Sequence, residues 1–171
     1  DRGWTLFRLG RREEAEAACR EALELLDEGP PSLARAQVHS LLGGLAYGRG
    51  DHDEAVAQHE AALALREDLG DQQGMGKSYN NLGIIAERRG DAAAAAIWHA
   101  RSVRLKAAAG DRPGLASAYN NLGALYWRQG DLSRAAAALG ASLDLKRRLG
   151  NRWGEAVTLA NLAEVLFDSG D

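Results

Sequence analysis

The sequence is poor in the residues that mark disulfide-rich, sheet-forming and membrane proteins. Its 171 residues include one cysteine, Cys19, and three prolines, and aromatic residues make up only 6%. A single cysteine excludes an internal disulfide framework and fits a reducing compartment, so we expect a cytoplasmic protein. No apolar run approaches the roughly 18 residues of a membrane-spanning helix, and no signal-peptide pattern opens the chain. We therefore expect no membrane contact.

What is present describes a folded, helix-rich chain. The sequence is 46% hydrophobic and 26% charged, with a formal net charge of −3. This apolar content can fill a core, and the dominant residues, alanine, leucine, arginine and glutamate, favour helices. Binding to a phosphate backbone needs a concentrated positive field, which a net negative chain lacks. We expect no direct contact with nucleic acid.

A 40-residue repeat is the strongest pattern in the sequence. Gly-Asp pairs recur at this spacing at Gly50-Asp51, Gly90-Asp91, Gly130-Asp131 and Gly170-Asp171. Halfway between them stand Gly70-Asp71, Gly110-Asp111 and Gly150-Asn151. The segment Tyr-Asn-Asn-Leu-Gly at 79–83 recurs intact at 119–123, and an alanine recurs as Ala15, Ala55, Ala95 and Ala135.

The repeated pairs divide the chain into helix-sized segments. Glycine can end a helix in a left-handed conformation, and the Asp or Asn after it can cap the next helix. Pro30 and Pro31 end another helix, with Ser32 as the next cap. We predict an all-α protein with nine helices, near 1–9, 11–28, 32–48, 52–68, 72–88, 92–108, 112–128, 132–148 and 152–168. Gly83 and Gly123 fall inside helices and predict close helix approach, with the repeated alanines facing them.

These residues resemble a tetratricopeptide repeat. The resemblance rests on Asn-Leu-Gly at 121–123, Tyr126, Gly130-Asp131 and Ala135, and it extends over essentially the whole chain. It implies a right-handed superhelical solenoid, a single array over 1–171 with about four repeats, partial at both ends and taken from a longer protein. The usual repeat has about 34 residues. The longer form is similar to repeats of kinesin light chains, of bacterial peptide-pheromone receptors, and of large bacterial signal-transduction and transcription regulators.

The resemblance also implies where a partner binds. In related repeats the Asn of Asn-Leu-Gly lines a concave groove and bonds the backbone of an extended peptide, which selects Asn81, Asn121 and Asn161. Asn80 and Asn120 are adjacent candidates, and Leu41 interrupts the series. An amide both donates and accepts, as a peptide unit does. The alternative is that these asparagines bond a neighbouring helix and only stabilise the stack.

Basic and aromatic residues supply further candidates. Arg8, Arg88 and Arg128 recur in register with Lys77 nearby, and would favour an acidic ligand on a concave face. Cations near a helix C-terminus also suit the helix dipole, so a structural role stays open. Tyr47, Trp127 and Phe167 occupy matching positions and would form either apolar pockets or inter-repeat core.

No pattern predicts an enzyme, a metal or a cofactor. The stretch from Gly70 to Ser78 resembles a phosphate-binding loop, but its first glycine is one residue too early and a helix precedes it, so an inter-repeat turn is preferred. Equivalent positions of Cys19, His59 and His99 on stacked helices lie too far apart for one zinc ion, which favours packing. We predict a non-enzymatic protein- or peptide-binding module of a bacterial regulator. The alternative is a structural spacer that self-associates through exposed terminal helices.

Overall fold

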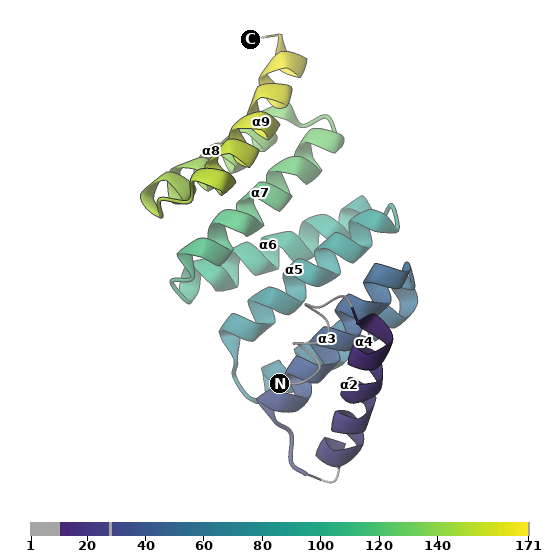
Figure 1. Cartoon of the computed structure of the whole chain (residues 1–171). Helices are drawn as coiled ribbons and strands as arrows, with labels where there is room; N and C mark the ends of the chain where they lie inside the picture. The colour runs from purple at the N-terminus through teal and green to yellow at the C-terminus, as the bar shows by residue number, and fades with distance from the viewer. Residues whose placement is uncertain (1–10, 28, 171) are drawn as a thin grey trace. The chain divides into compact units, whose positions relative to one another are not determined.

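The structure, a computed structural model, describes residues 11–27 and 29–170, and this part of the chain is helical apart from its turns (Figure 1). The helices are α2 (Arg12–Asp27), α3 (Leu33–Arg49), α4 (His52–Asp68), α5 (Gln72–Arg88), α6 (Ala92–Ala108), α7 (Arg112–Arg128), α8 (Leu132–Arg148) and α9 (Arg152–Ser169). Each was predicted to within one residue at either end. The helix expected near 1–9, with Arg8, lies outside the described residues. The all-α prediction is confirmed.

The chain divides into two compact units. The first spans Asp1–Ile85 and the second spans Ala86–Asp171, so the division falls within α5. The first unit holds α2, α3, α4 and most of α5; the second holds α6 to α9. Within each unit, successive helices run in opposite directions and are joined by short turns (Figure 1).

The turn between α3 and α4 shows why the Gly-Asp pairs set the helix boundaries. Gly50 adopts a left-handed φ of 83°, and its N–H donates to the Tyr47 carbonyl at 3.0 Å. The Asp51 side chain then accepts from the Glu54 N–H at 3.1 Å, capping α4. A side chain would strain this glycine, whereas aspartate is a favoured N-cap. The predicted turns are confirmed, and Ser32 caps α3 as expected.

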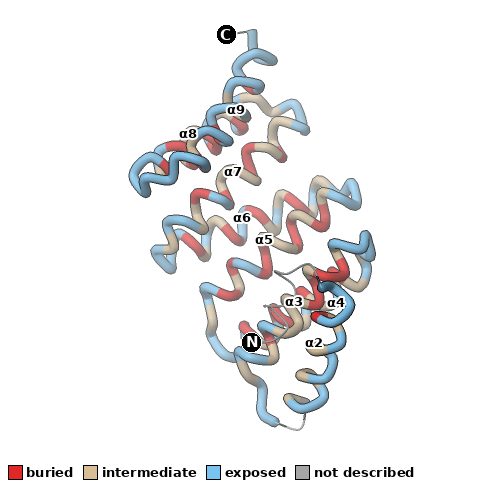
Figure 2. Tube along the Cα trace, in the orientation of Figure 1, coloured by how far each residue is buried: buried red, intermediate tan, exposed pale blue. Residues whose placement is uncertain are grey.

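Small residues bring the helices close together. The repeated alanines are fully buried: Ala15, Ala55, Ala95 and Ala135. Figure 2 shows buried positions along each helix alternating with exposed ones. A Cβ on Gly123 would lie 2.7 Å from Leu139 Cγ, which confirms the predicted close approach. The facing residue was predicted wrongly, however, because Leu139, and not Ala135, stands nearest this glycine. Leucine fills the space that the missing Cβ leaves.

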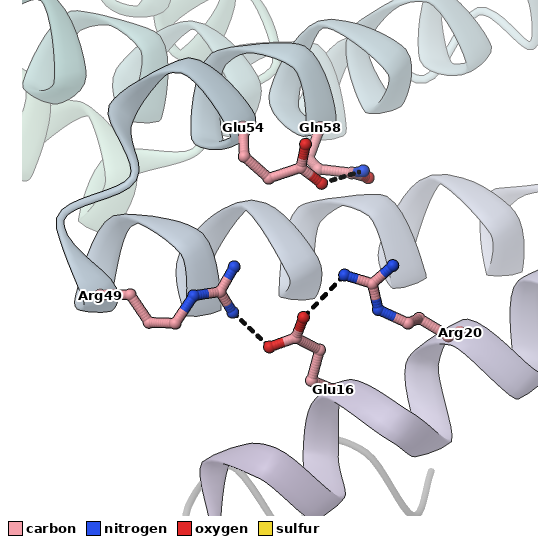
Figure 3. A network of polar contacts seen from close by, with 5 residues as sticks. All are labelled: Glu16, Arg20, Arg49, Glu54 and Gln58. Atoms are coloured by element: carbon pink, nitrogen blue, oxygen red, sulfur yellow. Dashed lines mark hydrogen bonds and ion pairs between the residues drawn. The ribbon is translucent and has the colours of Figure 1, made fainter.

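Charged side chains join α2 to α3 at the surface. Glu16 on α2 accepts a hydrogen bond from Arg20 at 2.8 Å and forms an ion pair with Arg49 at the end of α3 (Figure 3). On α4, Gln58 donates to Glu54 at 2.8 Å. Such exposed pairs contribute at most about 1 kcal/mol each, so they add little to the free energy that keeps α2 packed on α3.

The apolar contact of α2 with α3 surrounds Cys19. The Cys19 side chain is buried with Ala15 against Leu42 and Leu45. Burial, together with the Glu16 charge, raises the pKa of the Cys19 thiol. Cys19 therefore remains a protonated, apolar core residue, as the packing interpretation expected.

Candidate functional site

The first unit contains a half-open hollow between three helices. Its volume is about 170 Å³, and it is lined by Gly44 and Tyr47 of α3, His59 of α4, and Asn81, Ile84 and Ile85 of α5. Two residues predicted to bind a partner, Tyr47 and Asn81, thus meet in one place. The walls are largely apolar, and the Asn81 amide is a hydrogen-bonding group among them.

A missing side chain creates the hollow. Gly44 stands where the next repeat has Ile84, and a Cβ placed on Gly44 would meet no atom within 4 Å. Its neighbour Gly43 differs, because a Cβ there would lie 2.8 Å from the His59 ring. Glycine inside a helix costs about 1 kcal/mol relative to alanine. At Gly43 the close approach of His59 leaves no room for a side chain, which is a reason to keep glycine despite its cost. At Gly44 no neighbour excludes a side chain, and the space beside the glycine is open.

His59 forms a buried polar wall of the hollow. Only 2% of its surface is exposed, and its Nδ1 atom is buried without a hydrogen-bond partner. Burial, with a smaller contribution from the Arg66 charge, lowers the pKa of His59 to about 4. The imidazole is therefore neutral near neutral pH. A buried polar atom without a partner is rare in folded proteins and costs free energy relative to a hydrogen-bonded one.

The second unit contains a polar cluster made by α7, α8 and α9. Lys146 Nζ donates to Thr158 Oγ1 at 2.5 Å and to Asn120 Oδ1 at 3.4 Å. The same Asn120 oxygen accepts from Thr158 Oγ1 at 3.0 Å and from Asn161 Nδ2 at 3.4 Å. Thr158 is fully buried and Lys146 is 7% exposed. We call these four residues the Lys146 cluster.

The five predicted asparagines fall into different environments. Asn120 and Asn161 bond each other between α7 and α9, as the alternative structural role requires. Asn81 lines the hollow. Asn80 and Asn121 are half-buried and have interactions of their own within the chain. The structure therefore does not present the asparagines as one equivalent set.

The predicted basic residues lie at the surface. Lys77 and Arg88 are exposed. Arg128 is exposed too, and it forms an ion pair with Glu87, whose other carboxylate oxygen lies 2.6 Å from His99 Nε2. An acidic ligand at Arg128 would therefore compete with a carboxylate of the chain itself.

The two remaining predicted aromatic residues differ in exposure. The Trp127 indole donates to Asp168 at 2.6 Å, whereas Phe167 is 85% exposed. Phe167 packs into no core in the described part of the chain, and Trp127 borders the buried cluster of Ala135, Leu139 and Val165.

The tetratricopeptide repeat family matches this sequence over residues 2–68 and 74–148. The chain belongs to the tetratricopeptide repeat family. The family predicted from the Gly-Asp and Asn-Leu-Gly residues is thereby confirmed. No protein of curated function matches the chain in sequence.

Solved structures of other repeat proteins share the fold. BtubC from P. vanneervenii is 24% identical, with a TM-score of 0.89, over 99% of this chain and 70% of that one. Aspartyl phosphate phosphatase F from Bacillus subtilis is 16% identical, with a TM-score of 0.86, over 96% of this chain and 42% of that one. A putative kinesin light chain from Podosopora anserina is 15% identical, with a TM-score of 0.78, over 98% of this chain and 83% of that one. At these identities the similarity shows the fold alone.

The repeat register exposes one feature that sequence analysis missed. Arg66, Lys106 and Lys146 stand 40 residues apart in the last turns of α4, α6 and α8, and they are only 6%, 5% and 7% exposed. A basic residue in a last helical turn usually faces solvent and complements the helix dipole, so its burial was not expected. The regular spacing was the available signal.

The stretch from Gly70 to Ser78 is a turn followed by a helix. Gly70 has a φ of 68°, and α5 begins directly after Asp71, whose side chain accepts from the Gly74 N–H at 2.9 Å. Lys77 points to solvent, and Ser78 is buried against Arg66 Nη1 at 2.5 Å. Lysine and serine thus diverge, where a phosphate loop would bring them together.

The described residues offer no metal-binding group. Across 11–27 and 29–170, no three His, Cys, Asp or Glu side chains come together in a way that could hold an ion. His59 and His99 are both buried, in different units. None of the helices in these ranges has the length and apolar character that crossing a membrane requires.

Proposed function

We propose that this chain is a non-catalytic tetratricopeptide module that binds an extended protein or peptide segment, with one apolar side chain of that segment seated in the hollow. The observation that carries the proposal is the meeting of Tyr47, Asn81 and the space above Gly44. Family membership supports a binding role, because stacked helical repeats present extended surfaces to partners.

The dimensions and chemistry of the hollow fit one side chain. A cavity of about 150 Å³ accommodates a benzene-sized molecule. The hollow, at about 170 Å³, therefore suits one branched aliphatic or aromatic side chain. Asn81, at its edge, can donate to a carbonyl and accept from an N–H of the same segment. Burying one such side chain contributes about 1.5–3 kcal/mol, enough to select among segments.

We also propose that the module is the interaction or sensor region of a larger bacterial regulatory protein that acts in the cytoplasm. The composition and the long form of the repeat support this, since both are similar to those of bacterial multi-domain regulators. The chain spans 42% of aspartyl phosphate phosphatase F, so whole-protein activities of its structural relatives are not carried over.

Filling the hollow tests the binding proposal. Peptides would be selected from a displayed random library on the natural chain, then measured by titration on the Gly44→Leu variant. A Cβ at position 44 would meet no atom within 4 Å, and this position lines the hollow, so we expect a leucine side chain there to fill it. Binding should then weaken roughly tenfold or more while helicity is retained. We also expect the selected peptides to share one large apolar residue.

A matched control separates pocket filling from general effects. Gly140 on α8 is also half-buried with no atom within 4 Å of an added Cβ, and it belongs to the second unit and does not line the hollow. Gly140→Leu should leave peptide binding unchanged. Selected peptides that bind Gly44→Leu as tightly as the natural chain would refute the hollow as the site, and failure to select any peptide would refute the function.

A second candidate function is self-association through α9. Trp153 is 80% exposed and Phe167 is 85% exposed on this helix. Large apolar side chains that remain exposed often mark an interaction surface. This candidate predicts a molecular mass that rises with protein concentration.

A further inference from the structure

Lys146 is a buried cation without a counter-ion among the described residues. Its hydrogen-bond partners, Thr158 and Asn120, are both neutral, and no carboxylate of the described residues lies within ion-pair distance of it. Burial alone lowers the pKa of Lys146. Taking an ammonium group out of water costs several kcal/mol unless an opposite charge offsets it. The cluster therefore lacks one negative charge.

The first unit contains an equivalent buried cation, and there a carboxylate lies beside it. Arg66 occupies the equivalent position and donates to Ser78, as Lys146 donates to Thr158. Arg66 also lies 3.8 Å from the Asp71 carboxylate, whose charge raises the arginine pKa against the effect of burial. In that repeat a carboxylate of the chain itself serves the buried cation.

The repeat register shows where the missing charge would have come from. The residue five positions after the buried cation is Asp71 after Arg66 and Asp111 after Lys106, but Asn151 after Lys146. Asn151 still caps its helix, accepting from the Gly154 N–H at 2.9 Å, as Asp71 does from Gly74. The capping role is conserved across these repeats, and only the charge is removed.

We propose that the Lys146 cluster binds a carboxylate group brought by a ligand. Lys146 Nζ and Asn161 Nδ2 each donate to the neutral Asn120 Oδ1 at 3.4 Å, and the Thr158 hydroxyl lies 3.0 Å from both this oxygen and the Gly154 carbonyl. A carboxylate would bring two charged oxygens to these donors and neutralise the ammonium. Its single charge matches one lysine, and the half-buried Asn120 and Asn161 form the solvent-facing side. This site lies in the second unit and does not rest on the hollow.

Nuclear magnetic resonance titration tests the proposal with defined probes. N-acetylglycine offers a chain-terminal carboxylate, the α-amide of N-acetylglutamate offers a side-chain carboxylate, and N-acetylglycinamide is the neutral control. At constant ionic strength we expect a saturable shift of the Asn120 and Asn161 side-chain amide signals with a carboxylate probe, and none with the neutral control. The tighter carboxylate identifies the source as a chain terminus or an acidic side chain.

Two variants change the charge in opposite ways. Asn151→Asp retains a helix cap and restores the carboxylate found at Asp71, so we expect at least roughly tenfold weaker probe binding with no loss of thermal stability. Lys146→Met removes the cation with little change in side-chain length and should abolish the response. Gly44→Leu, in the other unit, should leave it unchanged, so failure of this site is distinguishable from failure of the hollow.

Each other outcome decides against the site. An equal response to N-acetylglycinamide would show that charge is not recognised. An unaltered carboxylate response in Asn151→Asp or Lys146→Met would place binding elsewhere. Absence of a saturable shift in the natural chain would show that Lys146 is satisfied by Thr158 and Asn120 alone, and tighter binding of inorganic phosphate would overturn the carboxylate assignment.

Discussion

At the scale of single residues, His59 couples packing to pH. Its ring fills the space beside Gly43, and burial lowers its pKa to about 4 from an ordinary value of 6.5. The unfolded chain therefore binds a proton more readily than the folded chain between these values. Stability that is complete above about pH 6.5 is lost as the pH falls toward 4.

We expect His59→Leu to remove this acid sensitivity. Between about pH 7 and about pH 4.5, the natural chain should lose about 2–3 kcal/mol more unfolding free energy than the variant. Leucine suits the position because Leu139 fills the equivalent space beside Gly123. Urea unfolding of both proteins at both pH values gives the loss of unfolding free energy in each. The difference between the two losses removes the contribution of other titrating groups, because both proteins contain them. Equal losses in the two proteins would show that His59 is not a neutral buried group.

Sequence reasoning found some residues of the two sites and missed others for physical reasons. Asn81 was found because the family resemblance carries over position by position, and Tyr47 because it occupies the same repeat position as Trp127 and Phe167. Gly44 was missed because a hollow is the absence of a side chain, visible only once its neighbours are placed. Lys146 was missed because a basic residue in a last helical turn has a sufficient explanation at the surface, and its burial depends on α9.

At the scale of helices, sequence and structure agree closely because every boundary is set locally. Glycine ends a helix and the next residue caps its successor within one turn, so no distant contact is needed to place them. The bounds of α3 to α9 follow directly from this punctuation. The contacts between helices could not be predicted from such local signals. Leu139, and not the predicted Ala135, lies nearest to Gly123.

The capping residues therefore carry a measurable share of helix stability. Asp91 accepts from the Ala94 N–H at 2.9 Å at the start of α6 and is exposed. We expect Asp91→Ala to lower the unfolding free energy by about 0.5–2 kcal/mol, and Asp91→Asn to lower it much less, because asparagine caps equally well. Chemical denaturation compares the three proteins. Indistinguishable alanine and asparagine variants would show that this cap contributes nothing.

At the scale of the whole molecule, α9 distinguishes the two candidate functions. If its exposed apolar face joins molecules, sedimentation should show a mass that rises with concentration. Replacing Trp153 and Phe167 together by serine should return the chain to a monomer. Leu25→Ser, at a residue that is 77% exposed on α2, is the control and should not change the mass. A natural chain with a constant mass would exclude self-association and leave the binding module.

Gly44 has a consequence for how such a protein can change over generations. The same repeat position holds glycine, isoleucine, alanine and glutamate along this one chain, at Gly44, Ile84, Ala124 and Glu164, in helices with the same turns. The fold therefore accepts many side chains there, and each gives a surface of different depth or charge. A single mutation at this position can alter which ligands are accepted while the scaffold stays intact, so new specificities can arise by small heritable steps.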